Sequence, residues 1–250
     1  MLKLPSSFKV EEVPNHLFNV HNINSISKKY PELRQKSKAP TFALTFQGTS
    51  HTLVKNIGFT QEEAEEIEQN YHKLYEVSDQ WVQDKIKQAA KNGYAEAAFG
   101  LKIRVPLLKQ VLYGSSSMPP AAAAEARTLG NAISGQSYGL LNNRAANAFM
   151  KKVWASKYRY DIKPVALIHD AIYLLIRDDI EVVEWVNREL IECMSWQELP
   201  EIQHPTVKIG AALDLFWPDW AHPITLPNNA NKATIFRICQ ETKGELMKAA

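Results

Sequence analysis

The sequence predicts an α+β fold in which several helices cover a small antiparallel sheet. Apolar residues recur at helical spacing in residues 61–92, 121–154 and 179–194. Two short β-prone runs, residues 158–167 and 172–177, lie between the last two of these stretches. Because few residues separate the two runs, we expect them to pair as neighbouring strands of the sheet.

The composition is that of an ordinary soluble globular protein. The 250 residues can bury a sizeable core in one or two domains. The formal net charge is only +2, so any nucleic-acid contact must come from a local basic surface. The cysteines, Cys193 and Cys239, lack metal-ligand spacing and suit a reducing compartment. No apolar stretch reaches membrane-spanning length, and we expect a cytoplasmic protein.

The N-terminal third is predicted to be mainly helical. Residues 1–22 show no clear period and are expected to form a loosely structured lead-in. Residues 31–48 have helical spacing, although Pro40 would remove a backbone hydrogen bond from such a helix. A capping box at residues 60–63 opens one long helix, which we expect to end before Gly93.

The remainder of the chain alternates between strands, loops and helices. Residues 94–108 lose the helical period and predict a strand or hairpin, and a Gly/Ser/Pro-rich loop follows at residues 113–120. After the helices and strands named above, residues 207–215 predict a last strand. The C-terminal end is polar.

Two polar residues, His169 and Asp170, interrupt the apolar run from Val165 to Ile176. A tight turn between two strands would hold Asp170 at its tip, where a carboxylate can coordinate a cation such as Mg²⁺. Aspartate is also frequent in hairpin turns that have no function. For the dipeptide alone, this structural interpretation is the favoured one.

A second pattern places Arg34, Lys38, Phe42 and Phe46 four residues apart, along one face of a helix. The two cations could hold a polyphosphate, and the two rings could pack against a flat base. A solvated basic turn followed by two core phenylalanines would explain the spacing equally well.

A third pattern spaces Arg127 and Asn131 one helical turn apart, and Gln136 follows slightly past the next turn. Arg, Asn and Gln are the residue types that contact phosphates, sugars and base edges in nucleic acids. Read alone, the stretch is more simply an ordinary polar helix face.

Taken in order, these stretches resemble family A DNA polymerases, the class of bacterial polymerase I and several phage replicases. The resemblance is closest to phage T5-type polymerases and covers roughly residues 23–222. Residues 34–46 resemble motif B, the fingers helix that grips the incoming nucleotide, with Phe46 in place of the usual tyrosine. Phe99 and Gly100, followed by basic residues, resemble the Phe-Gly-Arg-Arg segment.

The other two patterns complete the order of motifs in that family. Arg127, Asn131 and Gln136 are similar to the primer-template helix, although the glutamine lies one residue later than usual. His169 and Asp170 resemble motif C, in which Ala171 here replaces the usual glutamate. One such motif is weak evidence, whereas four in family order are highly specific.

The resemblance implies template-directed nucleotidyl transfer from a dNTP to a primer 3′-hydroxyl, with Mg²⁺ as the cofactor. Asp170 would be the metal ligand, and His169 and Lys38 would complete the catalytic set. The dNTP would be bound by Arg34, Lys38, Phe42 and Phe46. The primer-template DNA would be bound by Arg127, Asn131, Gln136 and His169.

Motif A, which supplies a second metal-binding aspartate in the family, is not recognised upstream of residue 34. Residues 1–33 contain no aspartate. The resemblance therefore implies a divergent lead-in over residues 1–22, fingers over 23–95 and the C-terminal part of the palm over 96–250. An N-terminal polymerase fragment in a second chain would carry motif A and the thumb. An inactive truncated remnant and a non-catalytic DNA-binding accessory module remain as alternatives, with a phosphohydrolase as a weaker one.

Overall fold

The computed structural model describes residues 25, 29–111, 114, 118–205 and 207–249, and the expected lead-in lies outside these ranges. The chain forms two compact units, which we describe separately. The first comprises residues 1–96 and 102–133, and the second comprises residues 97–101 and 134–250. The long helix α6 (Pro120–Ala155) begins in the first unit and ends in the second.

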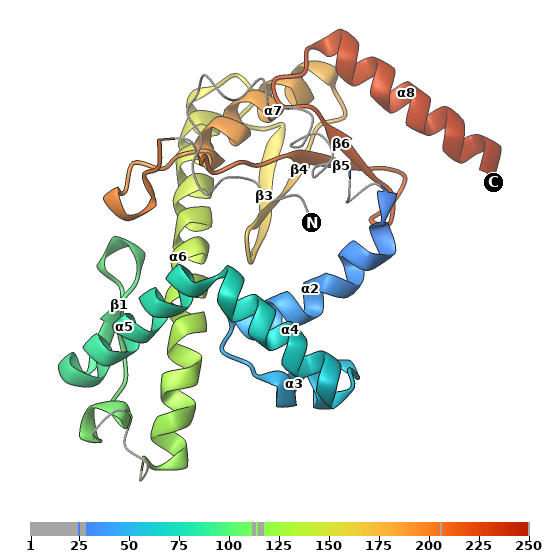
Figure 1. The fold of residues 1–250 in the computed structure, drawn as a ribbon. Coiled ribbons are helices and arrows are strands. Elements are labelled where there is room, and N and C mark those ends of the chain that lie inside the picture. Colours follow the sequence, from blue (N-terminus) through green and yellow to red (C-terminus); the bar gives the residue numbers. More distant parts are fainter. Residues whose placement is uncertain (1–24, 26–28, 112–113, 115–117, 206, 250) are drawn as a thin grey trace, which may run out of the picture. The chain divides into compact units, whose positions relative to one another are not determined.

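The first unit is mainly helical (Figure 1). In chain order its elements are α2 (Pro31–Thr45), α3 (Ser50–Ile57), α4 (Gln61–Leu74), α5 (Glu76–Asn92), β1 (Tyr94–Glu96), β2 (Lys102–Arg104) and the start of α6. Leu44, Leu53 and Ala64 form a small core among α2, α3 and α4. A second core joins α5, the β1–β2 hairpin and α6 through residues such as Ile86, Val105 and Leu129.

The single helix expected after residue 60 is in fact two helices, so that prediction was wrong. The capping box at Thr60 and Glu63 opens α4 as predicted, and Gly93 ends α5 with a φ of 85°. Between them Tyr75 leaves the helical region, with φ −112° and ψ 28°. A hydrogen bond between His72 and Asp79 spans this break, a contact seven residues apart that the helical pattern does not predict.

The second unit packs helices against two antiparallel hairpins. Its elements are the end of α6, β3 (Ile162–Ile168), β4 (Ala171–Ile176), α7 (Ile180–Met194), β5 (Leu213–Phe216), β6 (Pro223–Leu226) and α8 (Lys232–Ala249). Phe149 and Val153 of α6 form one core with Val186 and Leu190 of α7 and with the inner face of β3–β4.

The mixture of helices with antiparallel strands confirms the α+β prediction, and the C-terminal region departs from it in detail. The strand expected over residues 207–215 is shorter and later, at β5, and it pairs with β6, which was not predicted. Helix α8 was also missed, although Ile235 is buried against Ile224 and Leu226 of β6. Within the described part of the chain, no helix is both long enough and apolar enough to cross a membrane.

Candidate functional site

The predicted turn at His169 and Asp170 is present, and both side chains are exposed. Ile168 at the end of β3 pairs directly with Ala171 at the start of β4, so the loop has two residues. His169 has a φ of 54°, as a type II′ hairpin turn requires at its first central position. Asp170 therefore stands at the tip of the hairpin, where its charge does not have to be buried.

A buried asparagine holds this turn against α6. Asn142 is 5% exposed, and its Nδ2 donates hydrogen bonds to the carbonyl oxygens of His169, at 3.3 Å, and Ala171, at 3.1 Å. Asn142 was not among the residues predicted to form the site. The signal was its position three residues before Ala145 and seven before Phe149, on the helix face that is otherwise apolar.

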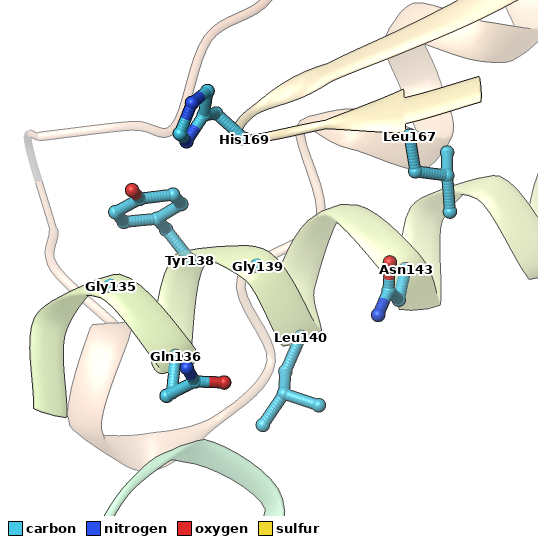
Figure 2. A pocket seen from close by; sticks show the side chains of 8 residues that line it. All are labelled: Gly135, Gln136, Tyr138, Gly139, Leu140, Asn143, Leu167 and His169. Carbon is cyan, nitrogen blue, oxygen red and sulfur yellow. The ribbon is translucent and has the colours of Figure 1, made fainter. Parts of the chain in front are cut away.

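An open pocket of about 360 Å³ lies between α6 and the end of β3. It is lined by Gly135, Gln136, Tyr138, Gly139, Leu140, Asn143, Leu167 and His169 (Figure 2). Figure 2 shows the Tyr138 ring beside His169, above the helix. The structure thus brings together two of the predicted site residues, Gln136 and His169. A Cβ on Gly139 would meet no atom within 4 Å, so the glycine leaves this wall of the pocket open.

The predicted nucleotide-binding residues lie on α2 or directly after it, in the first unit. Arg34 is exposed and Lys38 is half-buried, and neither has a salt-bridge partner among the residues that the structure describes. Phe42 is 59% exposed and Phe46 is 37% exposed, and their rings stack with centroids 6.2 Å apart. The two rings are not in the core, so the interpretation of this stretch as two core phenylalanines was wrong.

Arg127 and Asn131 lie on the part of α6 that belongs to the first unit, and both side chains are exposed. The opposite face of the helix is buried through Leu129, Gly130 and Ile133. A Cβ on Gly130 would come within 2.9 Å of Val82 on α5, so α5 and α6 approach closely there. This packing leaves the Arg127 and Asn131 face free for contacts outside the core.

The donor set near Asp170 fits part of a magnesium site. Mg²⁺ keeps several waters and is usually held by one or two carboxylates together with substrate phosphates. Asp170 can be one such ligand. In the described ranges, no group of three or more His, Cys, Asp or Glu side chains is placed to hold a metal ion. The remaining ligands would have to come from a substrate or from further polypeptide.

Comparisons with known proteins agree with the family resemblance. The sequence profile of DNA polymerase family A matches residues 12–213. The structure is similar to the POL domain of Pol1 from M. smegmatis in complex with DNA primer-template and dNTP, with a TM-score of 0.58 and 19% sequence identity. That match covers 72% of this chain but only 29% of the other. No curated protein matches the chain. Since the family profile spans most of its length, the chain belongs to DNA polymerase family A.

Proposed function

We propose that this chain forms the C-terminal fingers and palm portion of a template-directed DNA polymerase, acting in the cytoplasm of a bacterial cell. The observation that carries the proposal is the exposed carboxylate of Asp170, held at a fixed turn beside a polar pocket in a family A chain. In the reaction, the primer 3′-hydroxyl oxygen bonds to the α-phosphorus of a dNTP, the bond to the β-phosphate bridging oxygen breaks, and pyrophosphate leaves.

The pocket beside Asp170 would receive the end of the primer. Gln136 and His169 offer hydrogen-bonding groups at opposite walls, and Tyr138 adds a flat ring between them. Arg127 and Asn131 would contact the primer-template backbone and base edges. Mg²⁺, when bound, would help deprotonate the 3′-hydroxyl and would neutralise charge on the phosphates. Asp170 would contribute one carboxylate ligand to it.

The dNTP would lie along α2. Arg34 and Lys38 carry positive charges with no described acidic partner, so they are available to a triphosphate. Phe42 and Phe46 present exposed rings one and two turns further along the helix, where they would pack against the sugar and base. Electrostatic attraction at one end and ring packing at the other would orient the nucleotide.

A second polypeptide segment would supply motif A and the thumb. β3 and β4 pair only with each other in the described ranges, and a two-stranded hairpin is marginally stable by itself. Val165, Ile168 and Leu175 expose large apolar side chains on this hairpin. An added strand or domain that covers these residues would bury apolar area and could bring a second carboxylate close to Asp170.

A primer-extension assay tests the proposal. We expect the chain to bind primer-template DNA and to extend the primer only when an N-terminal polymerase fragment that carries motif A is added. Asp170→Asn should abolish extension and leave DNA binding largely intact. Extension by the chain alone would show that another group replaces the motif A aspartate. DNA binding without extension in either condition would instead favour the accessory module, and loss of both would favour the inactive remnant.

A further inference from the structure

The Phe99-Gly100 turn, which the proposed function leaves without a role, has a strained backbone. Phe99 adopts φ 58° and ψ 23°, in the left-handed region that bulky side chains rarely occupy. Gly100 follows with a φ of 76°. The turn is fixed to α6, because the backbone N–H of Ala98 donates to Oγ of Ser137 at 3.0 Å. A glycine at position 99 would relieve the strain, so the phenyl ring is kept there at a cost.

The ring of Phe99 is partly exposed, and its orientation is set by contacts with Trp196, which in turn contacts Arg144. It is 48% exposed and stacks on Trp196, with ring centroids 6.2 Å apart and planes 12° apart. The guanidinium of Arg144 lies 3.9 Å from the centre of the same indole ring. Arg144 is itself held by a hydrogen bond from its Nη1 to the carbonyl of Cys193. The phenyl ring is therefore oriented before any ligand arrives.

The Phe99-Gly100 turn is attached to the same stretch of α6 that lines the pocket near Asp170. Ser137, which anchors the turn, stands between Gln136 and Tyr138, and both of these residues line that pocket. A flat ligand on Phe99 would therefore lie close to whatever fills the pocket. In the proposed function that occupant is the end of the primer.

We propose that Phe99 is a stacking platform for an unpaired nucleobase of the bound DNA, an inference that rests on the proposed function. Every base has a π-face, so an exposed aromatic ring can bind unpaired bases with little regard to sequence. The ring planes of Phe99 and Trp196 are nearly parallel, and the stacked base would continue this order. The base would come from the single-stranded template overhang or from a frayed primer end.

DNA affinity measured by fluorescence anisotropy tests the platform with the chain alone. Phe99→Ala should weaken binding of a primer-template with a single-stranded overhang by between about 5-fold and 150-fold, the range for loss of one base–aromatic stack. Phe99→Tyr should retain affinity, because it keeps a flat ring. Phe236→Ala is the matched control, since Phe236 is a similarly exposed phenylalanine, at 58%, on α8. It should leave affinity unchanged.

A 2-aminopurine base identifies the source of the stacked base, since its fluorescence is quenched by stacking. Quenching that depends on Phe99 with the probe in the template overhang assigns the platform to the template. The same result with the probe at a mismatched primer terminus assigns it to the primer. Quenching that Phe99→Ala does not relieve at either position would overturn the platform.

Stability separates this role from a packing role. Phe99→Gly should not lower the midpoint of thermal unfolding, because glycine adopts the observed backbone angles without strain. It should nevertheless weaken DNA binding as much as Phe99→Ala does. A marked loss of stability with unchanged affinity would mean that the ring only packs against Trp196. If the wild-type chain binds no DNA, both the platform and the proposed function fail; DNA binding that is insensitive to Phe99→Ala overturns the platform alone.

Discussion

Asn142 ties the loop that carries Asp170 to α6 through two hydrogen bonds. Asn142→Leu keeps the side-chain size but leaves the carbonyls of His169 and Ala171 without this donor. We expect the free energy of unfolding to fall by about 1–3 kcal/mol. Hydrogen exchange should also become faster in residues 167–172. In an active assembly, kcat should fall more than DNA affinity does, because the position of Asp170 is no longer held.

Asn187→Leu is the matched control for this prediction. Asn187 is another buried asparagine on a helix, and its Nδ2 donates to the carbonyl of Pro227 at 2.8 Å. We expect a similar loss of stability without faster exchange in the His169-Asp170 turn. Equal rates of hydrogen exchange in this turn for Asn142→Leu and Asn187→Leu would contradict a positioning role for Asn142.

Among the side chains of α2, Lys38 should be the strongest nucleotide contact. Lys38→Ala should raise the KM for dNTP about tenfold or more in an active assembly, since a charge-assisted phosphate contact contributes about 1.5–3 kcal/mol. Affinity for primer-template DNA should change little. Lys36→Ala removes an exposed lysine from the same helix and serves as the control. Equal losses of dNTP use and DNA affinity would favour the interpretation that Arg34 and Lys38 belong only to a solvated basic turn.

Two ion pairs join α6 to α7 through Lys152. Nζ of Lys152 lies 2.7 Å from carboxylate oxygens of both Glu189 and Glu192. Partial burial acts to raise the pKa of Glu189, but hydrogen bonds from Lys152 and Arg188 together outweigh it and lower the pKa below its usual 4.5. A carboxyl with a lowered pKa stabilises the fold above its unfolded pKa, and this contribution is lost as pH falls through the folded pKa.

Glu189→Gln should therefore lower the free energy of unfolding by about 1 kcal/mol at pH 7, as expected for a partly exposed ion pair. The difference from the wild-type chain should disappear as the pH falls below 4.5 and through the lowered pKa. Denaturant titrations at several pH values would measure it. A difference that persists at pH 2 would mean that packing, and not charge, accounts for the loss.

The proposed metal site near Asp170 should depend on polypeptide beyond the described residues. One carboxylate with waters holds Mg²⁺ poorly. We expect the chain alone to bind Mn²⁺, a spectroscopic probe for Mg²⁺, weakly and with at most one ion near Asp170. Addition of a motif A fragment, DNA and dNTP should produce two ions and tighter binding. Asp170→Ala should remove both the weak binding by the chain alone and the tighter binding in the assembly. Two tightly bound ions in the isolated chain would contradict this expectation.

Features that depend on residues close together in the chain were predictable from the sequence. The capping box at Thr60 and Glu63, the end of a helix at Gly93 and a tight turn at His169 and Asp170 were all predicted and are all present. In each case the deciding interaction joins residues a few positions apart. The hydrogen bonds between Thr60 and Glu63, for example, cap α4 and also lower the pKa of the Glu63 carboxyl.

The burial or exposure of individual side chains was not predictable in this way and emerged from the packing of the folded chain. This packing separated α4 from α5, paired β5 with β6, placed α8 on that hairpin and left Phe42 and Phe46 outside the core. It also joined Asn142 to a turn 27 residues away. These outcomes depend on contacts between segments far apart in the chain, and a local pattern of apolar and polar residues does not specify which distant segment will cover it.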